Sequence, residues 1–334
     1  MLEMLSVIAP MFLVIVVGFA SGFVRRFRQA GPHLNAFVFY FALPTFVYTA
    51  MVTAPPVPEY PVMAMLIPVI VTPVLSVIIY VLAQWMTRSQ VPAGAAPDAM
   101  AAPTSLSATF GNVGYFGIPI SIGVLGPEAG LVAGIVHTLH NILYMNGYPL
   151  VRTTVNTLRA SDGELGSLGE LWRRVVWPIL KRAVLLNPVM LFIALALIIV
   201  FTPLQMPSLF DEPVAMLGET AVPLALFCVG LALHPALEGV RSGGVPKAPI
   251  AVATLVKLIA LPAATWLAIL PFYDSIGPIW AGVLIIIAAT PSSTTVFLFS
   301  EEYDGDGRLA AAILVASTAL SLITLPLIAE FMLI

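Results

Sequence analysis

The first feature of this 334-residue sequence is how little charge it carries. Asp, Glu, Lys and Arg make up only 9% of the residues, whereas soluble domains carry about 25%. Hydrophobic residues make up 60%, and the mean hydropathy is +1.01. A chain of this composition is expected to be an integral membrane protein and not a soluble domain with a large core.

Cysteine and the common enzyme motifs are also scarce. Cys228 is the single cysteine, which excludes an intramolecular disulfide and a cysteine metal cluster. Nothing resembles the HExxH, GxSxG or phosphate-loop patterns, so the sequence gives no support to those enzyme classes. The N-terminus lacks the basic start of a cleavable signal peptide, and we expect its apolar run to stay as a helix.

The long apolar runs predict an all-α, polytopic membrane fold. Runs of about 20 residues fit membrane-spanning helices, whereas a barrel would show alternating segments of roughly 10. The predicted spans are 3–24, 34–52, 61–86, 103–125, 128–151, 184–202, 213–236, 249–271, 277–299 and 308–332. A polar connection at 152–183 separates a first five-helix repeat, 1–151, from a second, 184–334. Because each half holds an odd number of spans, any similarity between the halves implies inverted topology.

The basic residues are distributed unevenly between the two sides. Thirteen of the fourteen follow odd-numbered spans: Arg25, Arg26, Arg28, Arg88, Arg152, Arg159, Arg173, Arg174, Lys181, Arg182, Arg241, Lys247 and Arg308. Connections after even-numbered spans carry acidic residues instead: Glu59, Glu128, Asp211, Glu212 and Asp274. The positive-inside rule predicts a multi-pass protein of the inner (plasma) membrane with both termini on the extracytoplasmic side. The basic and aromatic stretch 169–177 is expected to lie in the cytoplasmic interface as an amphipathic helix.

Two predicted spans are interrupted by residues that a lipid-facing helix would not contain. Glycines, Asn112 and Pro119 fall within 111–119, and Thr290, Pro291, serines and threonines fall within 290–295. Backbone groups freed at membrane depth must be buried in protein or face a water-filled cavity. Interruptions in corresponding positions of two inverted halves indicate a transporter site near the midplane.

We expect the polar groups of these interruptions to bind substrate. The candidate substrate contacts are Asn112, Gly114, Tyr115, Ser292, Ser293 and Thr294, with Asn141 from the fifth span. Amide and hydroxyl groups can hydrogen-bond a carboxylate, although the same groups could simply repair the broken helices. Pro119 and Pro291 are assigned to the geometry of the two breaks and not to contact.

Several stretches together resemble the auxin efflux carrier family, whose bacterial members include malonate-transporter-like proteins. They are LNAFVFYFALP at 34–44, GNVGYFGIP at 111–119, NP at 187–188, AVPLALF at 221–227, KLIALP at 257–262 and ATP at 289–291. The resemblance implies ten helices in two inverted repeats, with the fourth and ninth broken and crossing at their prolines, as in the bile-acid-symporter fold. It implies a scaffold of helices 1, 2, 6 and 7 that dimerises, and a transport domain of helices 3–5 and 8–10. It also implies transport of an organic anion, such as malonate, malate or an auxin-like weak acid.

Two ionisable residues lie within predicted spans. Lys257 is expected to attract the anion or to hold the crossover by donating to freed carbonyls, although its long side chain could instead reach the interface. Glu219 is a candidate for proton coupling because burial favours the neutral acid, or else a carboxylate near the outer interface. Glu219 also departs from the family pattern, so the family's ion coupling is not carried over.

The fifth span carries a polar patch on one helical face. His137, His140 and Asn141 are spaced i, i+3 and i+4, and Tyr144 follows three residues later. Two histidines without a third ligand give no metal site; interhelical hydrogen bonds or a proton-sensitive pair are the alternatives. In the first span, Gly18 and Gly22 form a GxxxG pattern that favours close helix packing or dimerisation.

The sequence therefore favours a secondary transporter and leaves two alternatives. One is a sodium-coupled symporter of bile-acid type, and the other is an intramembrane hydrolase using Ser292 or Ser293 with His137 or His140. We expect no organic cofactor or metal, and both H⁺ and Na⁺ are open as coupling ions. The expected partners are a small organic anion, the bilayer and a second copy in a homodimer, with no nucleic acid.

Overall fold

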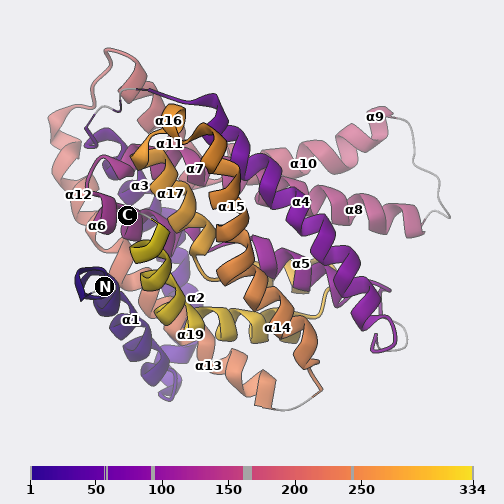
Figure 1. Ribbon diagram of the computed structural model, residues 1–334. Coiled ribbons are helices and arrows are strands. Elements are labelled where there is room, and N and C mark those ends of the chain that lie inside the picture. Colours follow the sequence, from indigo (N-terminus) through magenta and orange to yellow (C-terminus); the bar gives the residue numbers. More distant parts are fainter. Residues whose placement is uncertain are drawn as a thin grey trace.

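The computed structural model describes residues 2–55, 57, 59–91, 95–160, 168–241 and 244–332. Within these ranges the regular structure is entirely helical (Figure 1). The β-type pairing in them is confined to one antiparallel bridge between Gly111 and Ser292. The all-helical prediction is therefore confirmed for the described part of the chain.

The first half of the chain runs from α1 to α8. Its elements are α1 (Leu2–Ser21), α2 (Arg25–Phe37), η1 (Val38–Ala42), α3 (Leu43–Val52), α4 (Val62–Thr87), α5 (Ala101–Thr109), η2 (Val113–Gly117), α6 (Ile118–Leu125), α7 (Ala129–Asn141), η3 (Ile142–Asn146) and α8 (Gly147–Ala160). The elements α2, η1 and α3 follow one another without a gap, as do α7, η3 and α8. The fourth predicted span, by contrast, is divided between α5 and the segment made of η2 and α6.

The second half begins after the connection. The connection holds α9 (Leu168–Leu171), η4 (Trp172–Val176), α10 (Trp177–Leu180) and η5 (Lys181–Leu185). Then follow α11 (Pro188–Phe201), η6 (Ser208–Phe210), α12 (Asp211–Glu219), α13 (Ala221–Arg241), α14 (Lys247–Leu255), η7 (Val256–Ala260), α15 (Leu261–Ile269), η8 (Leu270–Phe272), α16 (Tyr273–Ile276), α17 (Pro278–Ala289), α18 (Thr295–Glu302) and α19 (Gly307–Met332). The ninth predicted span is divided between α17 and α18.

Prolines explain the π-helical turns inside the long helices. Four of these turns end two residues before a proline, namely Pro44 after η1, Pro119 after η2, Pro178 after η4 and Pro262 after η7. Proline has no N–H to donate, and its ring would clash with the carbonyl four residues earlier. A wider π turn accommodates both effects, so the helix continues across the proline.

Five helical stretches are long and apolar enough to cross a membrane by length and composition. They are 25–52, 62–87, 208–237, 247–276 and 307–330, and a sixth arises if 169–185 and 188–201, bent by 63°, count as one span. Shorter apolar helices cover 6–21, 113–125 and 278–289. The helical stretch from α7 to α8 is not among the five because His137, His140 and Asn141 lower its hydropathy. The count of ten spans thus stays a prediction.

The helices α1 and α13 pack closely along glycines. A Cβ on Gly18 would lie 2.2 Å from the carbonyl oxygen of Phe227, and one on Gly230 would lie 2.1 Å from the carbonyl oxygen of Ile15. A Cβ on Gly22 would meet His234 at 2.7 Å. The GxxxG pattern of the first span therefore serves packing within the chain.

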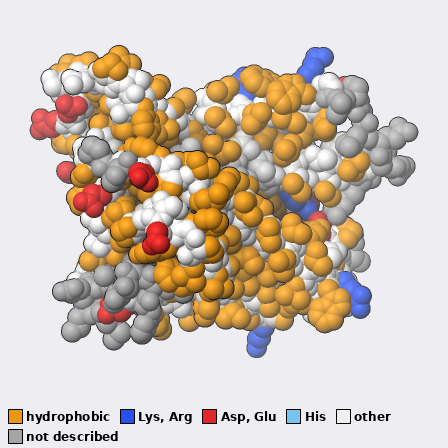
Figure 2. Space-filling model, turned by 45° about the horizontal axis from the view of Figure 1, so that its top comes forward, with side chains coloured by type: hydrophobic (Ala, Val, Ile, Leu, Met, Phe, Trp, Pro, Cys, Tyr) orange, Lys and Arg blue, Asp and Glu red, His pale blue; other side chains and the backbone are white. Residues whose placement is uncertain are grey.

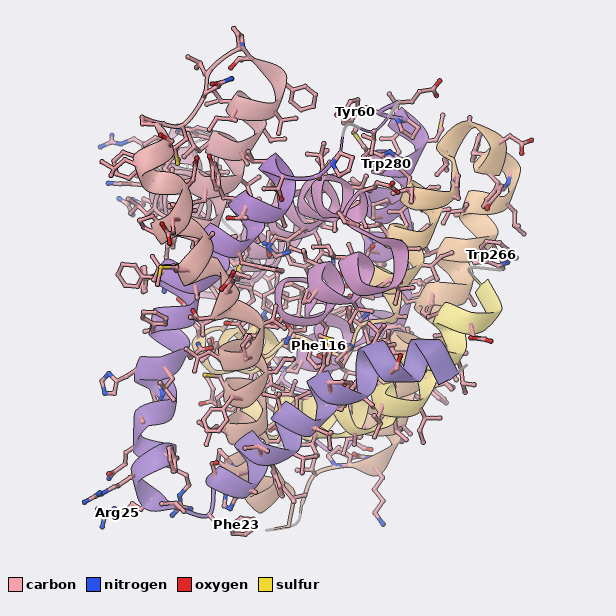
Figure 3. All side chains as sticks on the ribbon, turned by 90° about the vertical axis from the view of Figure 1, so that its left-hand side faces the viewer. Phe23, Arg25, Tyr60, Phe116, Trp266 and Trp280 are labelled. Atoms are coloured by element: carbon pink, nitrogen blue, oxygen red, sulfur yellow. The ribbon has the colours of Figure 1, made fainter. Side chains whose placement is uncertain are left out.

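Two groups of helices pack among themselves and also touch each other. In one, α3 packs against α11 and α12, and α2 packs against α13, which also pairs with α1. In the other, α5 packs against α4, α14 and α19, and α17 packs against α15 and α19, while α19 also contacts α13 and α1, and α7 contacts α3. The face drawn in Figure 2 is largely apolar, with acidic side chains mainly toward the left and basic ones at the upper edge, on the right and at the lower edge. In Figure 3, Arg25 lies at one end of the molecule and Tyr60 and Trp280 at the other, with Phe116 between them.

Candidate functional site at the two helix breaks

The two interrupted helices meet at their interruptions. The N–H of Asn112 donates to the carbonyl of Pro291 over 2.9 Å, and the N–H of Ser293 donates to the carbonyl of Phe110 over 2.9 Å. Gly111 and Ser292 form the antiparallel bridge between these bonds. Each break leaves backbone groups without a partner in its own helix. These groups form hydrogen bonds with the backbone of the other break, because buried backbone groups need partners.

Asn112 combines a structural role with a spare donor. It is 6% exposed, and its Oδ1 accepts a 3.3 Å hydrogen bond from the N–H of Tyr115, which caps the start of η2. Its Nδ2 is buried and has no hydrogen-bond partner among the described residues. The oxygen of this amide therefore repairs the broken helix, while the nitrogen remains available to a ligand.

The second break presents hydroxyl groups. The Oγ of Ser292 is buried without a partner among the described residues, and the N–H of Ser292 donates to Ser317 Oγ on α19 over 3.2 Å. Ser293 Oγ accepts from the N–H of Thr295 over 3.2 Å. Thr294 is half-buried at the start of α18 and makes no side-chain cap. Ser293 thus serves helix geometry, and Ser292 keeps a free hydroxyl.

Lys257 lies against both breaks. Its side chain is 0% exposed, and Nζ donates to the carbonyl of Ala288 in the last turn of α17 over 2.5 Å. A Cβ added to Gly111 would lie 3.1 Å from Lys257 Nζ, so the ammonium also borders the first break. No carboxylate among the described residues forms an ion pair with Lys257. A buried ammonium without an anionic partner is costly and marks a functional position in a membrane protein.

Because Gly111 and Gly114 have no side chain, neighbouring residues can lie close to the backbone of the first break. A Cβ at Gly111 would also meet Thr290 Oγ1 at 2.3 Å, and one at Gly114 would lie 3.3 Å from His137 Cε1. Tyr115 is 8% exposed, and its hydroxyl donates to Asn35 Oδ1 on α2 over 3.2 Å. Gly114 and Tyr115 therefore connect the first break to α7 and α2.

The polar patch of the fifth span borders the junction. His137, His140, Asn141 and Tyr144 are all 8% exposed or less. His137 Nε2 and Asn141 Nδ2 are 2.7 Å apart and hydrogen-bonded, so Asn141 is occupied by its own helix. His137 Nδ1, His140 Nε2 and the Tyr144 hydroxyl have no partner among the described residues. Phe110, immediately before the first break, stacks on Tyr144 at a centroid distance of 4.5 Å.

Two predicted residues lie away from this junction. Glu219 is exposed at the end of α12, so the burial on which its proton-coupling assignment depended is not found in the structure. Pro119 lies in the first turn of α6 inside the continuous helix 113–125, whereas the first break comes earlier, at 110–112. The corresponding Pro291 does lie at its break, where its carbonyl accepts from Asn112. A proline fits within α6 because η2 accommodates its missing donor.

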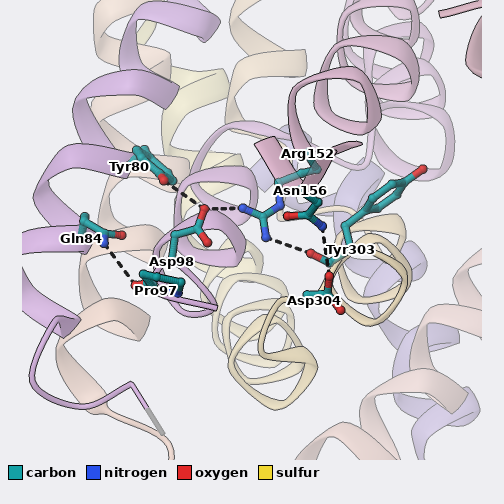
Figure 4. Close-up of polar contacts among 8 residues, drawn as sticks. All are labelled: Tyr80, Gln84, Pro97, Asp98, Arg152, Asn156, Tyr303 and Asp304. Atoms are coloured by element: carbon teal, nitrogen blue, oxygen red, sulfur yellow. Dashed lines mark hydrogen bonds and ion pairs between the residues drawn. The ribbon is translucent and has the colours of Figure 1, made fainter. Parts of the chain in front are cut away.

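A buried ion pair nearby was not expected from the sequence (Figure 4). Arg152 on α8 contacts Asp98 just before α5, and the two side chains are 3% and 1% exposed. Tyr80 on α4 donates to Asp98 Oδ2 over 3.0 Å, and Arg152 Nη2 donates to the carbonyl of Tyr303 over 2.9 Å. This network joins α4, the start of α5, α8 and the connection between α18 and α19. Its partners are 54 and 151 residues apart in the sequence, so no local pattern could have identified it.

A cavity of about 490 Å³ lies elsewhere. Its apolar lining includes Tyr60 before α4, Ile135 on α7, and Leu197 and Phe201 on α11. It contains none of the predicted site residues and offers few groups that could bind an anion. The chemistry that could recognise a carboxylate is concentrated at the two helix breaks instead.

The chain is similar to proteins that are named as transporters. Over 330 residues the chain is 24% identical to a protein of Rhizobium meliloti (strain 1021) named "Putative malonate transporter", covering 97% of this chain and 94% of that protein. Over 227 residues it is 28% identical to an "Uncharacterized transporter" of Methanothermobacter thermautotrophicus, covering 67% of this chain and 65% of that protein. Residues 4–329 match the family described as membrane transport protein. The chain is therefore a multi-pass membrane protein of that family, the auxin efflux carrier family, whose members are transporters and not enzymes.

Proposed function

We propose that the protein is a secondary active transporter of a small organic anion, such as a dicarboxylate. The observation that carries this proposal is Lys257, a fully buried ammonium without a carboxylate partner among the described residues. It borders both helix breaks, and a substrate carboxylate would supply the missing counter-charge. Broken transporter helices place their termini around substrate, with N-terminal dipoles favouring anions.

Spare donors surround the ammonium. Asn112 Nδ2 and Ser292 Oγ are buried next to the paired backbone and have no partner among the described residues. Groups of this kind bind carboxylate oxygens well, because the amide and hydroxyl hydrogens donate to them. In this proposal Lys257, Asn112 and Ser292 contact the anion directly. Gly114, Tyr115, Ser293, Thr294 and Asn141 shape the site around it, while Pro291 and Pro119 fix the helices.

The proposed mechanism is alternating access. It uses ten helices in two inverted repeats, 1–151 and 184–334, with the broken helices crossing near the midplane. The α1–α13, α3–α11 and α3–α12 contacts support a scaffold of α1, α2–α3, α11 and α12–α13. The other spans, which meet it where α19 packs on α13 and α1 and where α7 packs on α3, form the moving transport domain. We also propose a homodimer in the plasma membrane, with both termini outside, on the basis of the charge asymmetry and the family resemblance.

Uptake into proteoliposomes tests the proposal directly. Purified protein is reconstituted and offered labelled malonate, malate or indole-3-acetate, with no ion gradient, a pH gradient or a sodium gradient. We expect saturable uptake of at least one acid and competition by its unlabelled form. Protein-free liposomes and the Lys257→Met variant are the controls. If no acid in the panel moves or stabilises the purified protein against heat, the assignment to organic anions is wrong.

A further inference from the structure

We propose that His140 is the proton-binding group that couples proton movement to anion movement, an inference that rests on the proposed function. Glu219 is exposed, which leaves the two histidines of the fifth span as the proton-sensitive candidates. His140 is 7% exposed and lies beside the first helix break. A histidine can gain and lose a proton between about pH 5 and 8, which suits a coupling group.

The position of the His140 ring leaves one nitrogen free to accept a proton. The ring lies between Phe110 and Tyr144, at centroid distances of 5.2 and 4.8 Å. Nε2 of this ring is buried and without a partner among the described residues. Nε2 is therefore the atom that we assign to proton binding.

The neighbours of His140 make its protonation depend on the anion. The charged and titratable groups that face it are Lys257 from η7 and His137 and Tyr144 from its own helix. Lys257 borders Gly111, and the His140 ring lies beside the preceding residue, Phe110, so two positive charges would stand close together and repel each other. A carboxylate bound at Lys257 offsets this repulsion and allows Nε2 to take up a proton.

Thermodynamic reciprocity then gives coupling. If a bound anion favours protonation of His140, protonation of His140 must favour anion binding by the same factor, typically about 5- to 150-fold. The proton enters from the aqueous phase to Nε2 with the anion and leaves to the opposite side when the anion dissociates. One proton and one anion cross together, and no covalent bond to substrate forms or breaks.

His140→Gln tests this assignment, because glutamine keeps a polar side chain but binds no proton in this range. Net malonate uptake driven by an inward proton gradient should fall at least tenfold, and a pH dye inside the vesicles should no longer report proton entry. Exchange of labelled for unlabelled malonate without a gradient should continue, since the anion contacts remain. His33→Gln, at an exposed histidine of α2, is the matched control and should behave as the wild type.

Calorimetry on the wild-type protein gives a second measurement, which remains valid even if the His140→Gln variant does not fold. Malonate is titrated in two buffers of different ionisation enthalpy at about pH 7.5, above the ordinary imidazole pKa of about 6.5. We expect close to one proton taken up per malonate bound. Binding without proton uptake, or His140→Gln with unchanged proton-driven uptake, would overturn the role of His140 while leaving the anion transporter intact. If no acid binds or moves, both proposals fall.

Discussion

The ammonium of Lys257 donates to the carbonyl of Ala288, one of the last carbonyls of α17. The final carbonyls of a helix lack intrahelical partners and carry its negative dipole end, so a cation is well placed there. A single hydrogen bond leaves two of the three ammonium hydrogens available. The same side chain can therefore hold the break together and attract an anion to it.

Replacing Lys257 with methionine should strongly reduce uptake at low substrate concentration. Methionine fills a similar volume but carries no charge, and a hydrogen bond to a charged group contributes about 1.5–3 kcal/mol. We therefore expect uptake at subsaturating malonate to fall by roughly ten- to a hundredfold. Initial rates in proteoliposomes measure it, and Lys247→Met, at an exposed lysine at the start of α14, is the matched control. If the Lys257→Met variant takes up malonate with wild-type affinity, Lys257 only holds α17 in place and does not bind the anion.

Asn112→Asp separates the capping oxygen from the free nitrogen of this side chain. Aspartate caps a helix about as well as asparagine, so the bond to the N–H of Tyr115 should persist, although burial of the new carboxylate lowers the thermal midpoint. The donor at Nδ2, however, becomes an oxygen with negative charge that repels an anion. We expect a folded protein that does not take up malonate.

Asn187 provides the control for this substitution. It caps α11 in the same way, accepting from the N–H of Val189 over 3.0 Å, and is 6% exposed. Asn187→Asp therefore buries a carboxylate as Asn112→Asp does, so its thermal midpoint should also fall, but it should keep uptake. If Asn112→Asp transports as well as Asn187→Asp does, Asn112 only repairs the helix and does not bind substrate.

The sequence predicts where the helices break, because the reasons are local. Glycines and an asparagine at 111–114 and the Thr-Pro-Ser run at 290–293 cannot continue an apolar helix, and the structure joins these two segments. The burial of Lys257 also follows from its place in an apolar run. The structure adds that the exact break lies before Pro119, since a π turn lets that proline remain inside a helix.

Contacts between distant elements could not be predicted in this way. Asp98 lies in a polar connection, where it looks like any solvated acid, and Arg152 looks like one of several cytoplasmic positive charges. Only the packing of α4, α5 and α8 buries both and pairs them. Hydropathy likewise places Glu219 within a span but cannot tell which face of the helix it occupies, and in the structure it is exposed.

Gly111→Ala should destabilise the junction, whereas alanine in place of Gly147, which has no close neighbours, should not. A Cβ at Gly111 would lie 2.3 Å from Thr290 Oγ1 and 3.1 Å from Lys257 Nζ, and overpacking of this kind costs about 1–3 kcal/mol. We expect a lower thermal midpoint in detergent and a loss of uptake. Gly147→Ala in α8 meets nothing within 4 Å and should raise stability by about 0.5–1 kcal/mol, because glycine weakens a helix. Equal midpoints for the two variants would contradict the close packing at Gly111.

Removing one partner of the buried Arg152–Asp98 pair should destabilise the protein far more than removing both. Arg152→Met breaks a buried ion pair by removing its cation, which costs about 3–5 kcal/mol, while the double variant Arg152→Met/Asp98→Asn also removes the carboxylate charge and should recover much of the loss. The exposed pair Arg182–Glu302 is the control, because such pairs contribute at most about 1 kcal/mol. Thermal unfolding of the single and double variants in detergent gives the coupling free energy of each pair. Similar couplings for the two pairs would mean that Asp98 is solvated in the protein, and the network in Figure 4 would then not hold α4, α5 and α8 together.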